Sequence, residues 1–265
     1  MIDYNTLKEN SKQKFQMYGG GYFTEYFDYS KEGFENVSTN DISNFNNIGL
    51  NEHQMGMCAH LTLATSTMNR TESLLESITT WLRFPFKKIV IVDWSSDIPV
   101  EDSLREKGIT DNRIKIVRIN DQKMYNHSEA RNVKMAESEG WTLSIDSDIM
   151  LSPKFGRCIV LSKDTKVIYM NNRFTANKSL FGTTIFHKDE FDKVGGCSSS
   201  IDGWGSEDHD LFTRMKKNGC TQRDFGPRTI YHIPHDDFSR TYNTRYDDIY
   251  VSLAENGHKI YNEEV

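Results

Sequence analysis

The chain has 265 residues, of which 37% are hydrophobic and 26% charged, and its mean hydropathy is −0.64. These values are typical of a soluble globular chain that can form one large domain or two small ones. The net charge of −6 disfavours a nucleic-acid binder, which carries a basic surplus. The sequence has no long apolar run and no signal-peptide pattern, so we expect no transmembrane segment and a cytoplasmic location. Peripheral association with the inner face of a membrane is the alternative.

Three regions differ in composition. Residues 1–55 are rich in Asn, Tyr, Phe and Gly without periodicity, and they predict an irregular extension packed on the main domain. Residues 56–235 carry the regular patterns and are predicted to form that main domain, with a change of character between its halves 56–150 and 151–235. Residues 236–265 are predicted to form a C-terminal helical tail.

Strands and helices alternate in the first half of the predicted domain. In chain order we expect a strand at 59–70, a helix at 71–84 with Thr71 as its N-cap, a strand at 87–97, a helix at 100–108, a strand at 113–119, a helix at 126–141 with Ser128 as its N-cap, and a strand at 141–151. This order predicts right-handed crossovers, a mainly parallel sheet and helices on both of its faces. The second half is less regular, with strands at 165–171 and 183–188, helices at 188–194 and 207–219, and a strand before the histidines of "YHIPH".

Two of the predicted strands end in acidic residues. The strand "KKIVIVDWSSD" ends in Asp93 and Ser95, which can bind a nucleotide edge at the carboxyl end of a parallel sheet. The strand "WTLSIDSDIML" carries Asp146 and Asp148, which strand alternation would place on the same side. Two such carboxylates suit a hard cation such as Mg²⁺ or Mn²⁺. A structural turn is the alternative for both strand ends.

Histidine and arginine residues in two other motifs are candidates to act together with these acids. "YNHSEARN" places His127 and Arg131 on a helix just before the acidic strand, where they would meet a phosphate or remain on a solvated surface. In "YHIPH" the HExxH pattern is missing and Pro234 excludes a regular helix, which disfavours a zincin. His232 is therefore a candidate third metal ligand, and a buried structural histidine is the alternative.

The stretch "GWGSEDHD" combines flexible, aromatic and acidic residues at the start of a helix. Trp204, followed by Gly205, offers a ring face to the apolar side of a sugar. Glu207 and Asp208 are favoured electrostatically at a helix N-terminus, and one of them can act as a general base. The alternative is an acidic N-cap beside a core tryptophan.

Taken in chain order over most of residues 59–235, these motifs resemble the GT-A fold glycosyltransferases of the family 2 type. "IDSDI" resembles their Asp-x-Asp motif, and "GWGSEDHDLFTRM" is similar to the acceptor-side motif of β-1,4-galactosyltransferases and the bacterial chondroitin polymerase. The resemblance implies a Rossmann-like α/β fold with a nucleotide-binding half, 56–150, and a smaller acceptor-binding half, 151–235. The chain departs from the family in "ATSTMNR" and "DWSSD", which replace the common Pro-Thr-Tyr-Asn and Asp-Asp-Gly-Ser versions.

The resemblance also implies a role for each matching residue. On the nucleotide side, the resemblance implies contacts from Thr65, Asp93 and Ser95, with His127 or Arg131 at the diphosphate or base. Asp146 would lie at the ribose and the metal, and Asp148 and His232 would be Mn²⁺ ligands. The residues around the sugars would be Trp204, Gly205, Glu207 and Asp208. Asp208 would deprotonate the acceptor hydroxyl. Retaining relatives carry Asn at that position, so an Asp favours inversion.

The function that follows is an inverting, metal-dependent glycosyltransferase of polysaccharide biosynthesis. It would move a hexose or N-acetylhexosamine, Gal or GalNAc, from a UDP-sugar to a hydroxyl of a glycan or glycolipid, with Mn²⁺ or Mg²⁺ as cofactor. One alternative is a nucleotidyltransferase that makes an NDP-sugar, which would need a glycine-rich, basic phosphate loop in place of "ATSTMNR". The other is a non-catalytic carbohydrate-binding protein, which would explain Trp204 but not the combination of Asp146, Asp148 and His232.

Overall fold

The computed structural model describes residues 52–157, 161, 163–170, 180–224, 229–235, 243–244 and 256. The predicted extension 1–55 and the predicted helical tail 236–265 therefore lie almost entirely outside the described residues. Within the described part, none of the helices combines the length and apolarity needed to cross a membrane.

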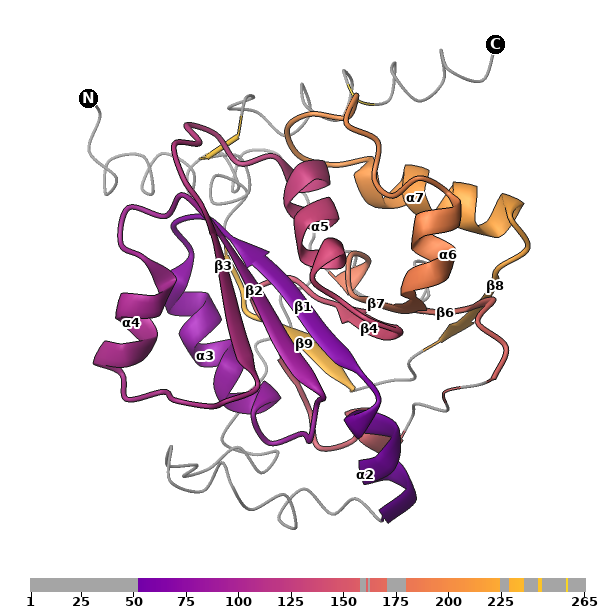
Figure 1. Ribbon diagram of the computed structural model, residues 1–265, viewed down its shortest axis with the longest axis horizontal. Helices are drawn as coiled ribbons and strands as arrows, with labels where there is room; N and C mark the ends of the chain where they lie inside the picture. Colours follow the sequence, from indigo (N-terminus) through magenta and orange to yellow (C-terminus); the bar gives the residue numbers. More distant parts are fainter. Residues whose placement is uncertain are drawn as a thin grey trace, which may run out of the picture.

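A seven-stranded sheet with the order β3-β2-β1-β4-β7-β6-β8 forms the centre of the fold (Figure 1). Its strands are β1 Thr62–Thr67, β2 Lys88–Trp94, β3 Ile114–Ile119, β4 Trp141–Ser144, β6 Val167–Met170, β7 Thr184–His187 and β8 Thr221–Asp224. β1 to β4 are parallel, and β7 runs antiparallel to both of its neighbours, β4 and β6. The predicted mostly parallel α/β sheet is confirmed.

Helices cover both faces of this sheet, as predicted (Figure 1). They are α2 Glu52–Ala59, α3 Thr71–Trp81, α4 Val100–Glu106, α5 His127–Ala136, α6 Lys188–Lys193 and α7 Glu207–Lys217, with a 3₁₀ turn at Phe155–Arg157. Ile89 and Ile91 of β2 belong to the same apolar cluster as Ile78 of α3, whereas Val90 clusters with Ala130 of α5. Since side chains alternate along a strand, α3 and α5 lie on opposite faces.

Two predicted helix starts are wrong by one or two residues. Thr71 is the first residue of α3, and Arg70 occupies the N-cap position without a side-chain cap bond. For α5 the N-cap is Asn126, whose extended backbone lets its Oδ1 accept from the Glu129 N–H at 2.9 Å. Ser128 already lies inside that helix, so it cannot serve as the cap.

The strand predicted at 141–151 is two strands with a turn between them. β4 ends at Ser144, and β5, Ile149–Leu151, leaves the main sheet to pair antiparallel with β9, Ile230–His232. Trp81 Nε1 of α3 donates to the Ile149 carbonyl at 2.8 Å, which ties β5 to the helix. Asp146 and Asp148 therefore lie in a turn, and the predicted alternation that would place them on one side does not apply.

Four of the largest buried side chains lie on the α3 side of the sheet. Trp81, Phe84, Phe86 and Phe155 are at most 1% exposed, and the three phenylalanine rings contact one another in tilted or edge-to-face pairs. Each side chain of this size stabilises the fold by about 1.5–3 kcal/mol on burial. This packing supports the base of the turn that carries the acidic residues.

Candidate active site

The candidate site lies at the carboxyl edge of the parallel strands, where the loops after β1, β2 and β4 meet the first turns of α5 and α7. Ligand sites of open α/β sheets are found at this edge. Two groups of charged side chains occur there. One surrounds Asp148, and the other surrounds Asp208.

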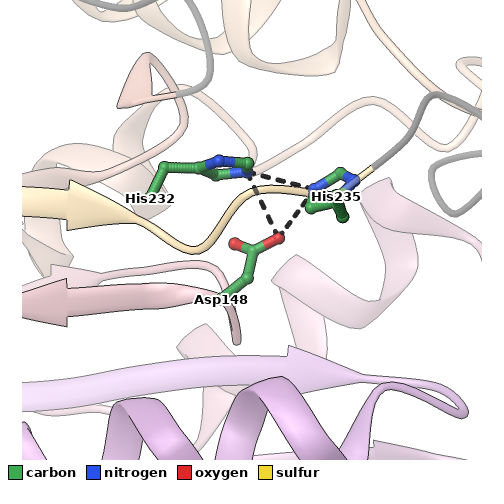
Figure 2. A group of neighbouring side chains, drawn as sticks. All are labelled: Asp148, His232 and His235. Carbon is green, nitrogen blue, oxygen red and sulfur yellow. Dashed lines mark hydrogen bonds and ion pairs between the residues drawn. The ribbon is translucent and has the colours of Figure 1, made fainter. Parts of the chain in front are cut away.

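The first group consists of Asp148, His232 and His235, whose side chains point toward one another (Figure 2). The Nε2 atoms of the two histidines lie 3.0 Å apart, and the Asp148 Oδ2 lies 3.0 Å from that of His235 and 3.5 Å from that of His232. The antiparallel pairing of β5 with β9 creates this proximity, because the Ile233 N–H donates to the Asp148 carbonyl at 2.8 Å. Residues far apart in sequence thus form a three-ligand group.

These separations fit a bound divalent cation. Ligands about 2.1 Å from a metal at right angles to one another are about 3.0 Å apart, and tetrahedral ligands are slightly farther apart. Two imidazoles and one carboxylate favour a transition metal such as Mn²⁺ over Mg²⁺, which prefers oxygen ligands. Sequence reasoning identified Asp148 and His232 but left out His235, whose only signal is its place three residues after His232.

Arg70 provides the nearest positive charge to this group. Its Nη2 lies 2.8 Å from the Asp148 Oδ2, and the carboxylate side chain is only 4% exposed. Burial alone would raise the pKa of Asp148, but Arg70 and hydrogen bonds from both histidines outweigh burial and hold this pKa well below its usual range. Asp148 is therefore ionised and suited to bind a cation. Arg70 was not predicted as a site residue, although it ends the polar turn after the first strand.

The second group consists of Glu207 and Asp208 at the start of α7 with Arg131 of α5. Arg131 Nη1 forms an ion pair with Asp208 and lies 3.7 Å from the Glu207 Oε1. The preceding Ser206 has a left-handed φ of 74° and makes no side-chain cap bond. The two acids are not a simple N-cap, because they pair with a buried arginine from another helix.

Burial changes the proton affinities of these acids. Burial raises the pKa of Asp208 to about 7 against the opposing charge of Arg131, and Glu207 and Asp146 add to the rise. Burial also raises the pKa of Glu207 despite Arg131. A carboxylate with a pKa near neutrality can accept a proton efficiently at physiological pH.

Several buried polar atoms of this group have no hydrogen-bond partner within the described part of the chain. They are His127 Nε2, Arg131 Nη1, Glu207 Oε2 and Asp208 Oδ1. The close Arg131–Asp208 contact is an ion pair without hydrogen-bond geometry. Buried polar atoms usually have partners, so His127 Nε2 and Glu207 Oε2, which have no such ion pair, indicate a place where a polar ligand completes the bonding.

His127 is neutral at physiological pH. Burial, followed by the charge of Arg131, lowers the pKa of His127 to about 3. Its ring packs edge-on against Tyr125, and its Nδ1 lies 4.0 Å from the Glu207 Oε1. Of the two residues predicted for the diphosphate or base, only Arg131 therefore carries a positive charge.

Asp146 lies beside the second group. An added Cβ on Gly182 would be 3.0 Å from both the Asp146 Oδ2 and the Asp208 Oδ2, and 3.7 Å from Arg131 Nη2. Asp146 and Asp208 thus approach the same glycine, which has room for no side chain. In the described residues, the three-ligand group does not include Asp146, so its role as a metal ligand stays a prediction.

The nucleotide-side residues make internal contacts. Asp93 Oδ1 accepts from the Ser96 N–H at 3.0 Å, while Oδ2 accepts from the Val100 N–H at 3.0 Å and forms an ion pair with Arg118. Ser95 Oγ donates to the Ile119 carbonyl at 2.8 Å. These bonds shape the loop after β2. Contacts of Asp93 and Ser95 with a nucleotide stay predictions, as does that of Thr65, which is fully buried on β1.

The loop that carries Trp204 and Gly205 is held by a residue near the C-terminus. The fully buried Asn256 donates through Nδ2 to the Gly205 carbonyl at 3.0 Å, and its Oδ1 accepts from the Asp202 N–H at 3.2 Å. Trp204 itself is partly buried. No pattern in the tail sequence indicated a contact with this loop, so Asn256 was not predicted.

Comparisons with known proteins agree with this fold. The mannosyltransferase PcManGT from Pyrobaculum calidifontis, solved with GDP-Man and Mn²⁺, has a TM-score of 0.51 and 12% identity, covering 62% of this chain and 54% of its own length. GalNAc-T7, solved with UDP, GalNAc and Mn²⁺, has a TM-score of 0.55 and 11% identity, covering 67% of this chain and 44% of its own length. This chain thus spans about half the length of either enzyme. No curated protein sequence matches it significantly.

The fold is therefore the GT-A fold of glycosyltransferases. Within this class, residues 165–236 match the family model described as the N-terminal domain of galactosyltransferase. That segment includes the acidic start of α7 together with His232 and His235.

Proposed function

We propose that the protein is an inverting, metal-dependent glycosyltransferase that transfers a hexose or N-acetylhexosamine from a UDP-sugar to a hydroxyl group of a glycan or glycolipid. One observation carries this proposal. A three-ligand metal group and a buried carboxylate with a pKa near 7 lie at the same edge of a GT-A sheet. Leaving-group stabilisation and acceptor deprotonation need these two components.

The metal group serves the leaving side of the reaction. Asp148, His232 and His235 would hold Mn²⁺, which supplies positive charge for the diphosphate that leaves. Arg70, already in contact with Asp148, adds a fixed positive charge there. Arg131 provides a second one beside the acids.

The acid group serves the acceptor side. Asp208 takes the proton of the acceptor hydroxyl as the oxygen attacks the anomeric carbon, and Glu207 accepts a hydrogen bond that orients the acceptor. Arg131 keeps Asp208 in place through their ion pair. Trp204 offers a ring face to the sugar. A single displacement with the base opposite the leaving group inverts the anomeric configuration.

Both structural neighbours support the metal choice, whereas only GalNAc-T7 and the family model support the donor choice, because PcManGT was solved with GDP-Man. Both structural neighbours were solved with a sugar or sugar nucleotide and Mn²⁺, and the matching family model describes a galactosyltransferase domain. We therefore favour Gal or GalNAc as the transferred sugar. Membership of family 2, a role in polysaccharide biosynthesis and a cytoplasmic location stay predictions.

The two alternatives explain less of the site. A carbohydrate-binding protein gives no reason for a three-ligand metal group and an acid whose pKa is raised to about 7 at the same edge of the sheet. For a nucleotidyltransferase, the loop after β1 would have to be a glycine-rich, basic phosphate loop, yet "ATSTMNR" has no glycine and only one basic residue, Arg70.

A thermal-shift screen tests the proposal. UDP, UDP-Gal, UDP-GalNAc, UDP-Glc and GDP-Man are compared with and without Mn²⁺. A ligand at a hundredfold excess over its Kd stabilises the folded state by about 2.7 kcal/mol. In the wild type and in the surface control Glu76→Ala, we expect UDP-sugars to raise the melting temperature when Mn²⁺ is present and not when it is absent. In Asp148→Ala, we expect no rise under either condition. Failure of every nucleotide sugar to stabilise the wild type would refute the proposal, and a response to GDP-Man alone would refute the UDP donor.

A further inference from the structure

Lys134 is a buried lysine close to the candidate active site that the proposed mechanism does not use. It lies on α5, one turn after Arg131, and only 1% of the residue is exposed. Its Nζ donates to the backbone carbonyl of Ile145, the residue before Asp146, at 3.4 Å. An ammonium group is rarely buried this deeply unless nearby groups compensate its charge.

The charged and titratable groups around Lys134 come from every element that packs there. They are Arg131 and His127 on α5, Asp146 in the turn after β4, Cys197 in the loop before α7, and Asp208 at the start of α7. Burial, followed by Arg131, lowers the pKa of Lys134 to about 8, while Asp146 and Asp208 oppose this decrease. Lys134 therefore remains mostly charged at neutral pH.

The charges at this place are nearly balanced. The three carboxylates Asp146, Glu207 and Asp208 face the two cations Arg131 and Lys134. When all five are ionised, their net charge is −1, and without Lys134 it becomes −2. In a buried site with weak screening, this difference acts directly on the nearest carboxylates.

We propose that Lys134 is a positioning residue for the acid pair Asp146 and Asp208: it holds the backbone that leads into Asp146 and supplies a buried positive charge that favours the ionised form of Asp208. The functional meaning of this inference rests on the proposed role of Asp208 as base. Arg131 makes the direct contact with Asp208, and Lys134 provides the second charge without occupying either carboxylate oxygen. Asp208 then keeps its second oxygen, Oδ2, for the acceptor.

The first experiment measures the titration of Asp208 by NMR in full-length, ¹³C-aspartate-labelled protein, with Asp208→Asn used to assign the signal. We expect Lys134→Met to raise the midpoint of the Asp208 titration by about half a pH unit or more, because a nearby positive charge is lost. Lys134→Arg should return it close to the wild-type value. Lys107→Met, which removes an exposed lysine just after α4, should leave it unchanged. An unchanged midpoint in a folded Lys134→Met protein would overturn the proposal.

A reciprocal measurement keeps the proposal testable if Lys134→Met does not fold. Two interacting groups shift each other's proton binding by the same free energy. Asp208→Asn should therefore lower the titration midpoint of the ¹⁵N-labelled Lys134 ammonium group by as much as Lys134→Met would raise that of Asp208. No change in Lys134 would contradict the inference.

Both titrations are made without substrate, so they separate this inference from the proposed function. Reciprocal shifts in a protein that transfers no sugar would leave the charge coupling intact and refute the function. A transferase whose Asp208 and Lys134 titrate independently would leave the function intact and refute the role of Lys134.

Discussion

Asp93, which is fully buried, and Asp208, which is partly buried, both lie at the ligand edge of the sheet, yet their surroundings differ. Asp93 accepts hydrogen bonds from two backbone N–H groups and pairs with Arg118. Asp208 forms an ion pair with Arg131 through Oδ1 and lies near Glu207 and Asp146, and within the described residues that oxygen accepts no hydrogen bond. The first carboxylate completes its own loop, and the second keeps bonding capacity for a ligand.

The difference shows how one residue type serves two purposes at one edge of a sheet. A carboxylate whose oxygens accept hydrogen bonds stabilises the folded loop, and removing it mainly lowers the free energy of unfolding. A largely buried carboxylate that lacks such hydrogen bonds and has a raised pKa costs stability, and removing it mainly changes the chemistry. Substitutions should therefore separate the two regions by what they change.

The largest expected effect on folding comes from Asp93→Ala. Removing this carboxylate leaves Arg118 and two backbone N–H groups without their partner, and the loss of one member of a largely buried pair costs about 3 kcal/mol. Chemical denaturation measures the free energy of unfolding. Asp97, four residues along the chain, is exposed, so Asp97→Ala should lower the free energy of unfolding much less.

The same Asp93 variant can break the comparison. We expect the folded protein to bind UDP with Mn²⁺ less than tenfold more weakly than the wild type. A much greater loss of affinity at modest loss of stability would show that Asp93 leaves its loop partners to contact the uracil.

Substitution of a metal ligand should have the next largest effect. Loss of His235 removes one of three ligand atoms, so the Kd for Mn²⁺ in calorimetry should rise about a hundredfold, which corresponds to about 2.7 kcal/mol. His187→Ala is a matched control, since this histidine lies beside Trp141 at the end of β7 that is far from the candidate site. Equal Mn²⁺ affinities in His235→Ala and the wild type would exclude His235 as a ligand.

The pH dependence of transfer should reflect Asp208. Because its pKa is raised to about 7, the proton-accepting form is lost as the pH falls through 7, and the rate should fall about tenfold per pH unit below that point. Above pH 7 the rate should level off. A rate that stays constant down to pH 5 would be incompatible with Asp208 as the base.

The smallest effect is expected from Asn256→Ala. Two hydrogen bonds to the loop of Trp204 would be lost, at a cost of about 1 kcal/mol each. The Michaelis constant for the acceptor should increase while the Kd for Mn²⁺ stays the same. A change in Mn²⁺ affinity would show that the tail supports both groups and not the acid group alone.

Much of the fold could be predicted from the sequence because the parallel strands are short, continuous apolar runs. Val90 and Ile91 face opposite sides of the sheet and both are fully buried, which is the pattern that "KKIVIV" indicates. The break between β4 and β5 was not predictable in the same way. The run continues through Ile145 and Ile149, and only the pairing of β5 with β9 reveals the turn.

The candidate site was predictable where the motif residues follow a recognisable element. Glu207 and Asp208 start a helix with clear periodicity, so their place was correctly expected. His235, Arg70 and Lys134 could not be found in this way, because their roles depend on tertiary contacts with Asp148 and Ile145. Asn256 contacts the site from the end of the chain, where no pattern pointed to it.

The most direct test of the account is single-turnover transfer by Asp208→Asn, measured beside calorimetric binding of UDP with Mn²⁺. The amide keeps the shape of the side chain but cannot take up a proton at neutral pH. We predict a rate at least about a hundredfold below that of the wild type, with unchanged UDP and Mn²⁺ affinities. Transfer at the wild-type rate by a variant that binds UDP and Mn²⁺ normally would contradict the assignment of Asp208 as the base.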